Sequence, residues 1–258
     1  MVKGLEIFKE HFSAYNKCYT LIGGVACMLS MENAGLQFRA TKDLDIVLCV
    51  ESLEEKFVKV FWSFIKDGDY QIRQRSNGKK IFYRFCNPAK STYPEILELF
   101  SRKPNAIYLK NDSHLTPIPV SEEISSLSAI LLNEDYYKFI HEGKYEIEGL
   151  SIVNPTHLIP LKARAFLDLL SQSQTGTHVD EKDIRKHRND VFRLYQLLTE
   201  NSHVHLPESI QQDMKKFFVE LKNNSSIDLM SLGLKNIKLN DVLITLANIY
   251  GVYSEKIT

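Results

Sequence analysis

Arg39-Ala-Thr-Lys-Asp-Leu-Asp-Ile-Val-Leu48 is the stretch that decides the expected fold, together with Leu21-Ile-Gly-Gly-Val-Ala26 upstream. Asp43 and Asp45 are separated by one residue and open an apolar run that predicts a buried strand. Alternate residues of a strand share a face and lie about 7 Å apart along it, so two such carboxylates can bind metal ions together. The second Gly, Gly24, precedes Asp43 by nineteen positions.

The Gly pair adds a phosphate-binding element to the carboxylate pair. A Gly-Gly turn that opens a helix presents backbone N–H groups and the positive end of the helix dipole to an anion. Each half has an ordinary explanation, because Asp-x-Asp also occurs at solvated strand ends and Gly-Gly in plain turns. The order of strand, Gly-Gly, helix and Asp-x-Asp strand favours metal-assisted phosphoryl or nucleotidyl transfer.

With these motifs the chain resembles the nucleotidyltransferase superfamily, which has the DNA polymerase beta-like fold. Within it the chain is similar to the AbiEii/AbiGii toxin-type nucleotidyltransferases. The resemblance covers residues 19 to 198, and the last sixty residues add nothing to it. Its motifs are Gly23-Gly24-Val-Ala26, Thr41-Lys-Asp43-Leu-Asp45, Pro94-Glu-Ile-Leu-Glu-Leu-Phe-Ser-Arg102, Leu161-Lys-Ala163 and Lys186-His-Arg-Asn-Asp190-Val.

The resemblance implies a magnesium-dependent nucleotidyltransferase that moves a nucleoside monophosphate from a nucleoside triphosphate to a hydroxyl. Asp43, Asp45 and Glu98 would bind two Mg²⁺ ions, with Mn²⁺ as an alternative, and Lys162 would complete the catalytic set by neutralising charge on the leaving pyrophosphate. The nucleotide-binding residues implied are Gly23, Gly24, Thr41, Lys42, Lys162 and Asp190.

Several of these residues have competing interpretations. Glu95 competes with Glu98, but Glu95 directly follows Pro94, where a strand is only beginning. A single lysine such as Lys162 is by default a surface residue. Near Asp190 the chain departs from the family pattern, because Arg193 stands three positions later, where a second acidic residue is often found. Thr41 and Lys42 fit a plain loop equally well.

The bulk properties predict a soluble globular protein without a membrane span. The chain has 258 residues, 44% hydrophobic and 25% charged, and its formal net charge of zero gives no general attraction to nucleic acid or membrane. The cysteines Cys18, Cys27, Cys49 and Cys86 form no Cys-x-x-Cys pair. Three of them lie in or beside apolar runs and are expected to be reduced core residues, which favours the cytoplasm. The N-terminus lacks the apolar stretch of a signal peptide.

The predicted fold class is α+β, with a mixed β-sheet nucleotidyltransferase core followed by a mainly helical C-terminal domain. The expected domains are residues 1–118 and 119–258. Helices are predicted at 3–17, 24–35, 52–66, 155–171, 180–200, 207–222 and 238–250, with Ser52 and Glu55 as a capping box. Strands are predicted at 19–22, 43–50 and 96–100, with hairpins at 71–85 around Ser76-Asn-Gly78 and at 145–153 around Glu148-Gly149. A turn-rich segment at 103–119 and a polar loop at 172–178 complete the expected organisation.

The acceptor and partners are the open part of the interpretation. Resemblance to the toxin-type enzymes implies an RNA acceptor such as the end of a transfer RNA, or a hydroxyl of a partner antitoxin, and a role as the toxin of a toxin–antitoxin or abortive-infection system. The basic segments 73–80 and 182–188 are candidate phosphate contacts, although such segments are more often solvated surface. The first rival interpretation is a catalytically silent nucleotide- or RNA-binding module of the same fold. The second is a toxin or antitoxin that acts chiefly through protein–protein contact of its C-terminal helices, with Phe217, Phe218 and Leu221 as the interface, although these residues are expected in the core.

Overall fold

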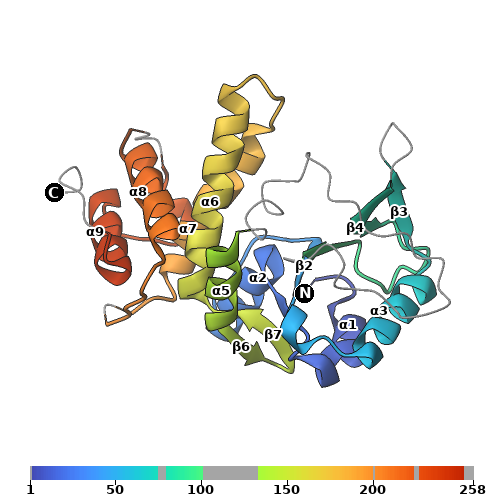
Figure 1. Ribbon diagram of the computed structural model, residues 1–258. Coiled ribbons are helices and arrows are strands. Elements are labelled where there is room, and N and C mark those ends of the chain that lie inside the picture. Colours follow the sequence, from blue (N-terminus) through green and yellow to red (C-terminus); the bar gives the residue numbers. More distant parts are fainter. Residues whose placement is uncertain (1, 75–79, 101–132, 200, 224–226, 253–258) are drawn as a thin grey trace. The chain divides into compact units, whose positions relative to one another are not determined.

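The computed structural model describes residues 2–74, 80–100, 133–199, 201–223 and 227–252 (Figure 1). The chain divides into two compact units. The first comprises residues 1–33, 37–124 and 144–153, and the second comprises residues 34–36, 125–143 and 154–258. The first contains a mixed sheet with helices and the second is helical, so the fold class is α+β.

The strands of the first unit form one sheet of seven described strands, in the order β3-β4-β5-β2-β1-β7-β6. Their bounds are β1 Tyr19–Leu21, β2 Asp43–Leu48, β3 Gln71–Gln74, β4 Lys80–Cys86, β5 Ile96–Phe100, β6 Lys144–Ile147 and β7 Leu150–Val153. β1 pairs antiparallel with β2 and parallel with β7, and β2 pairs parallel with β5. Antiparallel hairpins β3-β4 and β6-β7 form the two edges, as the sequence predicts.

Side-chain alternation gives the two faces of this sheet different chemistry. Tyr19 pairs with Leu48 and Phe85 with Leu97, so these apolar side chains lie on one face. Asp45 belongs to the alternate set of β2 residues and therefore lies on the opposite face. One face consequently forms the hydrophobic core while the other carries the carboxylates.

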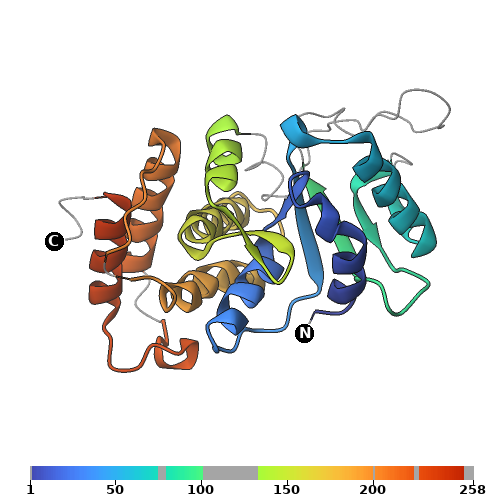
Figure 2. The same ribbon diagram turned by 90° about the horizontal axis from the view of Figure 1, so that it is seen from below.

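Two helices cover the apolar face with aromatic side chains. Helix α1 (Leu5–Phe12) begins after Gly4, whose φ of 77° is incompatible with a helix, and it contacts α3 (Glu55–Asp67). The two lie side by side in Figure 2. Their buried aromatic residues meet Tyr19 and Phe85 of the sheet. The cluster comprises Phe8, Phe12, Tyr19, Phe57, Phe61, Phe64 and Phe85.

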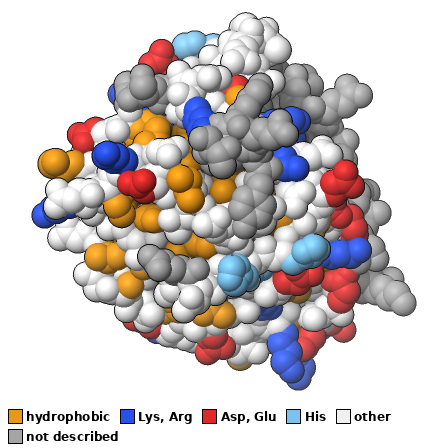
Figure 3. All heavy atoms as spheres, turned by 90° about the vertical axis from the view of Figure 1, so that its left-hand side faces the viewer, with side chains coloured by type: hydrophobic (Ala, Val, Ile, Leu, Met, Phe, Trp, Pro, Cys, Tyr) orange, Lys and Arg blue, Asp and Glu red, His pale blue; other side chains and the backbone are white. Residues whose placement is uncertain are grey.

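The second unit is built from the helices α5 (Glu134–Glu142), α6 (Pro155–Gln174), α7 (Glu181–Tyr195), α8 (Glu208–Asn223) and α9 (Leu239–Tyr250). The central helix is α6, which contacts α5, α7 and α8. Phe217, Phe218 and Leu221 of α8 are fully buried, so they belong to the core rather than to an interaction surface. Figure 3 faces the side that carries α8 and α9, where a few hydrophobic side chains reach the surface. The large exposed ones among the described residues are Val219, Met230, Ile237 and Ile244.

Several predicted boundaries are wrong. Ser52 caps no helix, because residues 50–52 form a 3₁₀ turn and α3 begins at Glu55 after Glu54, without a side-chain cap. The first α-helix ends at Phe12 and is followed by a 3₁₀ turn, Ser13–Tyr15. Helix α6 extends to Gln174, into the segment that was expected to be a loop. Helix α5, capped by the Asn133 side chain, was not predicted.

The expected division of the chain also differs from the structure. The hairpin β6-β7 was assigned to the C-terminal domain, yet it completes the sheet of the first unit by pairing with β1. A pairing between strands so far apart in sequence leaves no local signal. The expected boundary at 118/119, the turn Ser76-Asn-Gly78 and the turn-rich segment 103–119 lie outside the described residues. In the described part of the chain, no helix has the length and hydropathy needed to cross a membrane.

His157, in the first turn of α6, is half-buried within the second unit. Its ring stacks on Phe139 at 4.3 Å between centroids, and its Nδ1 lies 2.9 Å from Oδ1 of Asn154, which caps the helix. A Cβ at Gly143 would overlap the ring, so the site has no spare room. Burial lowers the pKa of His157 from 6.5 to about 4, because the charged ring is poorly solvated there.

The His157 pKa predicts a loss of stability in mild acid. Between pH 6.5 and 4 the unfolded chain binds a proton at this position and the folded chain does not, so stability falls as the pH falls through this window. We expect the wild-type protein to lose on the order of 1–2 kcal/mol more than His157→Gln between pH 7.5 and pH 5. Urea unfolding of both proteins at the two pH values measures this difference, and equal losses would show that His157 titrates normally.

Candidate functional site

The Gly pair lies where β1 passes into helix α2 (Gly23–Asn33). The backbone ladder with β2 continues one residue beyond β1, because the Ile22 N–H donates to the Asp45 carbonyl oxygen at 3.0 Å. Gly23 then turns the chain with a φ of 67°, a left-handed conformation that side chains rarely adopt. The first N–H groups of α2 have no acceptor within the helix and point out from its N-terminal end, as in any α-helix.

Gly23 is in close contact with β2, and Gly24 with the residues that lead into it. A Cβ at Gly23 would overlap the carboxylate of Asp45, and a Cβ at Gly24 would overlap the hydroxyl of Thr41. Asp45 is buried, with 7% of its surface exposed. The Gly pair is therefore a steric requirement of the carboxylate site, since only glycine leaves room for Asp45 and Thr41.

The strand register brings Glu98 beside the Asp pair. Asp45 of β2 and Glu98 of β5 are direct partners in parallel strands, and Asp43 lies two residues before Asp45 on the same face. Glu95 precedes Ile96, the partner of Asp43, and its carboxylate lies 3.3 Å from the Lys42 ammonium. The register thus favours Glu98 over Glu95 as the companion of the Asp pair, and it gives Lys42 a carboxylate partner.

Glu98 already has a cation partner. Arg84 of β4 is its direct neighbour in the sheet, and the Arg84 Nε lies 3.2 Å from the Glu98 Oε1. The Nε–H is not aligned for a hydrogen bond, so charge rather than hydrogen-bond geometry holds the pair. Among the described residues, no group of three or more His, Cys, Asp or Glu side chains is arranged to hold a metal ion. The expected trio shares one face of the sheet, where Glu98 faces Arg84 as well as the Asp pair.

The C-terminal motif residues meet inside the second unit. The Lys162 ammonium on α6 lies 3.2 Å from Oδ2 of Asp190 on α7, with side-chain exposures of 5% and 0%. The Arg193 guanidinium lies 3.2 Å from the other oxygen of Asp190. The surface interpretation of Lys162 is therefore wrong. Arg193, at the position of the missing second acid, serves as a further cation for Asp190.

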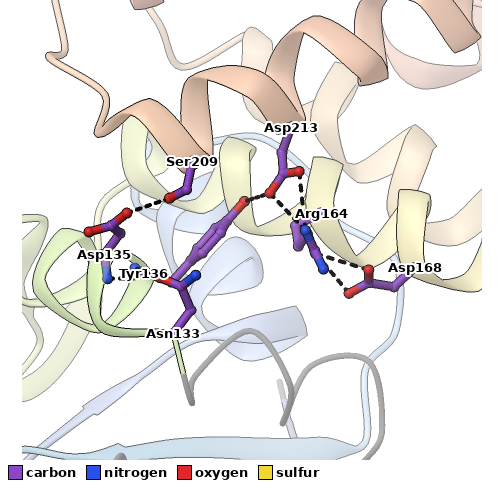
Figure 4. Close-up of polar contacts among 7 residues, drawn as sticks. All are labelled: Asn133, Asp135, Tyr136, Arg164, Asp168, Ser209 and Asp213. Carbon is purple, nitrogen blue, oxygen red and sulfur yellow. Dashed lines mark hydrogen bonds and ion pairs between the residues drawn. The ribbon is translucent and has the colours of Figure 1, made fainter.

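A second polar cluster joins α5, α6 and α8 (Figure 4). The Arg164 Nη1 donates to both oxygens of Asp213 at 3.1 and 3.0 Å, and its Nε donates to Asp168 at 3.0 Å. Tyr136 donates its hydroxyl to Asp213 at 2.9 Å. Burial raises the pKa of Tyr136 well above its usual value, and the negative charge of Asp213 raises it further, so this hydroxyl remains a donor. Sequence reasoning missed this cluster. The i,i+4 spacing of Arg164 and Asp168 gives a local signal, but Tyr136 and Asp213 come from two other helices.

In the candidate RNA-contacting segment 182–188, several basic side chains are paired or buried. In the segment 182–188, Arg185 pairs with Glu181 at 3.2 Å and Lys186 with Asp183 at 3.4 Å, which reduces the local positive charge. Arg188 is buried, and its pKa is lowered by burial and by the nearby charge of Arg185. Most of the segment 73–80 lies outside the described residues.

Comparison with known proteins finds similarity to a solved structure but none to a family profile. The sequence matches no protein-family profile and no curated protein. The chain is similar to the crystal structure of an antigenic nucleotidyltransferase-like protein from Paracoccidioides brasiliensis, with 16% sequence identity and a TM-score of 0.47. The similarity spans 94% of this chain and 99% of that chain.

The contact between Gly23 and Asp45 predicts an unusually large effect of a single methyl group. Gly35 is a matched control, since it also has a positive φ, 72°, but a Cβ there meets nothing within 4 Å. Gly35→Ala should cost about 1–2 kcal/mol from the left-handed backbone alone. Gly23→Ala should cost clearly more in urea unfolding, because the carboxylate must also move.

A double variant isolates the steric part of this effect. Replacing Asp45 by Ala removes the atoms that the new methyl group would meet. Gly23→Ala/Asp45→Ala should therefore be more stable than Gly23→Ala alone. Equal costs for Gly23→Ala and Gly35→Ala, with no recovery in the double variant, would contradict the close contact.

The buried Lys162–Asp190 pair predicts a large loss of stability when one partner is removed. Lys162→Met should cost about 3–5 kcal/mol, because a buried carboxylate loses one of its cations. Lys59→Met is the control, since Lys59 pairs with Glu55 at 2.7 Å but both side chains are exposed, and it should cost less than about 1 kcal/mol. Lys162→Met/Asp190→Asn should recover part of the loss. Reduced nucleotide affinity at unchanged stability would instead indicate that Lys162 serves the ligand alone.

Proposed function

We propose that the chain is a metal-dependent nucleotidyltransferase that moves a nucleoside monophosphate from a nucleoside triphosphate to a hydroxyl and releases pyrophosphate. The observation that carries this proposal is the contact between the Gly23 turn and the Asp45 carboxylate. It joins a helix N-terminus, which suits a phosphate, to a carboxylate pair, which suits a cation. A phosphorylated ligand and its cation would therefore meet at one place in the first unit.

The residues present fit a hard divalent cation. Asp43 and Asp45 offer oxygen ligands from one strand face, and Glu98 offers a third from the partner position on β5. Carboxylate oxygens suit Mg²⁺, with Mn²⁺ as the alternative, and we expect two ions. When bound, such ions supply Lewis-acid stabilisation of the charge on the transferring phosphoryl group. Glu98 would act beside Arg84, whose Nε lies 3.2 Å from the Glu98 Oε1.

The protein's own groups would bind and orient the nucleotide. The N–H groups following Gly23 and Gly24 would hold phosphate oxygens, and Thr41, in contact with Gly24, would keep the turn in place. Lys42 would contribute positive charge beside the carboxylates, where its present partner is Glu95. Such catalysis requires positioning and electrostatic stabilisation rather than a covalent step on the protein. Lys162 as the cation for pyrophosphate, and Asp190 as part of the nucleotide site, stay predictions of the family resemblance.

The proposal also covers the acceptor of the nucleotide and the biological role of the protein. Family resemblance favours an RNA acceptor, with the end of a transfer RNA or a partner antitoxin as candidates, and a toxin acting in the cytoplasm. A catalytically silent nucleotide- or RNA-binding module is the second candidate function. It is favoured by the ion pair of Glu98 with Arg84, which occupies the expected third metal ligand. The two functions differ in whether bound nucleotide is turned over.

Transfer assays with carboxylate variants test the proposal. Each radiolabelled nucleoside triphosphate is incubated with the protein, Mg²⁺ and total RNA, and labelled product is measured. Asp45→Asn should reduce transfer by about two orders of magnitude or more, because metal-ion stabilisation is worth several kcal/mol. Glu98→Gln should reduce it strongly, whereas Glu95→Gln, the matched control on the same segment, should have a small effect.

Nucleotide binding separates the two candidate functions. Equilibrium binding of each triphosphate with Mg²⁺ is measured on the same variants. Binding without transfer to RNA, protein or a small hydroxyl compound would support the silent module. Full transfer by Asp45→Asn would exclude the proposed metal site altogether.

A further inference from the structure

Two cysteines of the first unit face each other across the β1-β2 ladder. Tyr19 pairs with Leu48, and extending this antiparallel register by one position pairs Cys18 with Cys49. The backbone confirms the extension, because the Cys49 N–H donates to the Cys18 carbonyl oxygen at 2.8 Å. Both are thiols and both side chains are buried, with 1% and 4% of their surface exposed.

The spacing of such a pair is compatible with a disulfide. Directly opposite residues of an antiparallel ladder have Cα atoms about 4.5–5.5 Å apart, and disulfides join Cα atoms about 4.4–6.8 Å apart. The ladder ends at this pair, since the Cys18 N–H donates to the Tyr15 carbonyl oxygen and Cys49 leaves the β conformation with φ −85° and ψ 86°. The backbone at this end can therefore adjust without breaking bonds inside the sheet.

A lysine of the edge hairpin approaches the same two sulfur atoms. The Lys144 ammonium on β6 lies 3.4 Å from Sγ of Cys49. Burial raises the pKa of both thiols, while the Lys144 charge acts in the opposite direction on each of them. The Cys18 thiol donates to the Ser52 carbonyl oxygen at 3.1 Å, so its proton has a defined acceptor. Lys144 thus favours the thiolate at Cys49 over that at Cys18.

We propose that Cys18 and Cys49 form an oxidisable dithiol that a peroxide converts into a disulfide. The Cys49 thiolate attacks one peroxide oxygen, the O–O bond breaks, and a sulfenic acid and one water form after protonation. The Cys18 sulfur then attacks the Cys49 sulfur, the S–O bond breaks, and the second water leaves. In sum, two thiols and one hydrogen peroxide give one disulfide and two waters.

The crosslink would act on the strands that position the proposed phosphate and carboxylate groups. Cys18 directly precedes β1, which leads into Gly23, and Cys49 directly follows β2, which begins at Asp43. A disulfide would clamp the far end of this strand pair. The inference concerns the thiols alone and does not depend on the proposed transferase activity.

Peptide mapping of the oxidised full-length chain tests the proposal. The reduced protein is treated with hydrogen peroxide, remaining thiols are alkylated, and protease fragments are analysed by mass spectrometry without reductant. We expect a linked peptide that contains Cys18 and Cys49, the loss of two of the four thiols, and their return with dithiothreitol. Lys144→Met should slow formation of the link several-fold, because less Cys49 thiolate is present.

Single-cysteine variants provide the controls. Cys18→Ser and Cys49→Ser should each abolish the link, whereas Cys27→Ser on α2 and Cys86→Ser on β4 should leave it unchanged. Cys86 is the more exposed residue, so exposure alone would direct oxidation there. Oxidation confined to Cys86 in the wild-type protein, with Cys18 and Cys49 still alkylated as thiols, would overturn the proposal. This result needs no variant and is independent of whether a variant folds.

Discussion

The contact between Gly23 and the Asp45 carboxylate is the constraint on which the rest of the first unit depends. The chain must turn with a positive φ at Gly23 while Asp45 occupies the space that a side chain would need. This requirement places the start of α2 directly against β2. The same close approach at Gly24 secures Thr41. Because neither glycine has a side chain, the start of α2 can lie directly against the Asp45 carboxylate and the Thr41 hydroxyl.

Strand alternation extends this local constraint over the whole sheet. Aromatic side chains of α1 and α3 cover one face of the sheet. On each strand, the residues that alternate with those facing α1 and α3 point to the other face. There Asp45, Glu98 and Arg84 follow one another on the adjacent strands β2, β5 and β4. Burying a carboxylate costs less when a cation lies beside it, and Arg84 provides one for Glu98. The register thus brings carboxylates of two strands and a cation of a third together on one face of the sheet.

In the second unit, too, cations of the protein pair with buried carboxylates. Asp190 is completely buried and is compensated within the unit by Lys162 and Arg193. Arg164 likewise holds Asp168 and Asp213. Removing one partner of such a pair would leave a carboxylate uncompensated, which is costly where the carboxylate is buried, as at Asp190 and Asp213. Residues that look catalytic in a motif therefore also have a structural role, and stability and ligand binding must be measured separately for each.

The sequence by itself determined the local elements and the composition of the site. Periodic apolar residues predicted most helices and strands, and the Gly-Gly and Asp-x-Asp spacing predicted a turn and a strand that the structure places in contact. Only the tertiary structure decided which distant strands pair. That pairing added β6-β7 to the sheet, placed Arg84 beside Glu98, and set Cys18 opposite Cys49. The physical reason is that hydrophobic periodicity and turn chemistry act over a few residues, whereas strand register is set by burial across the whole sheet.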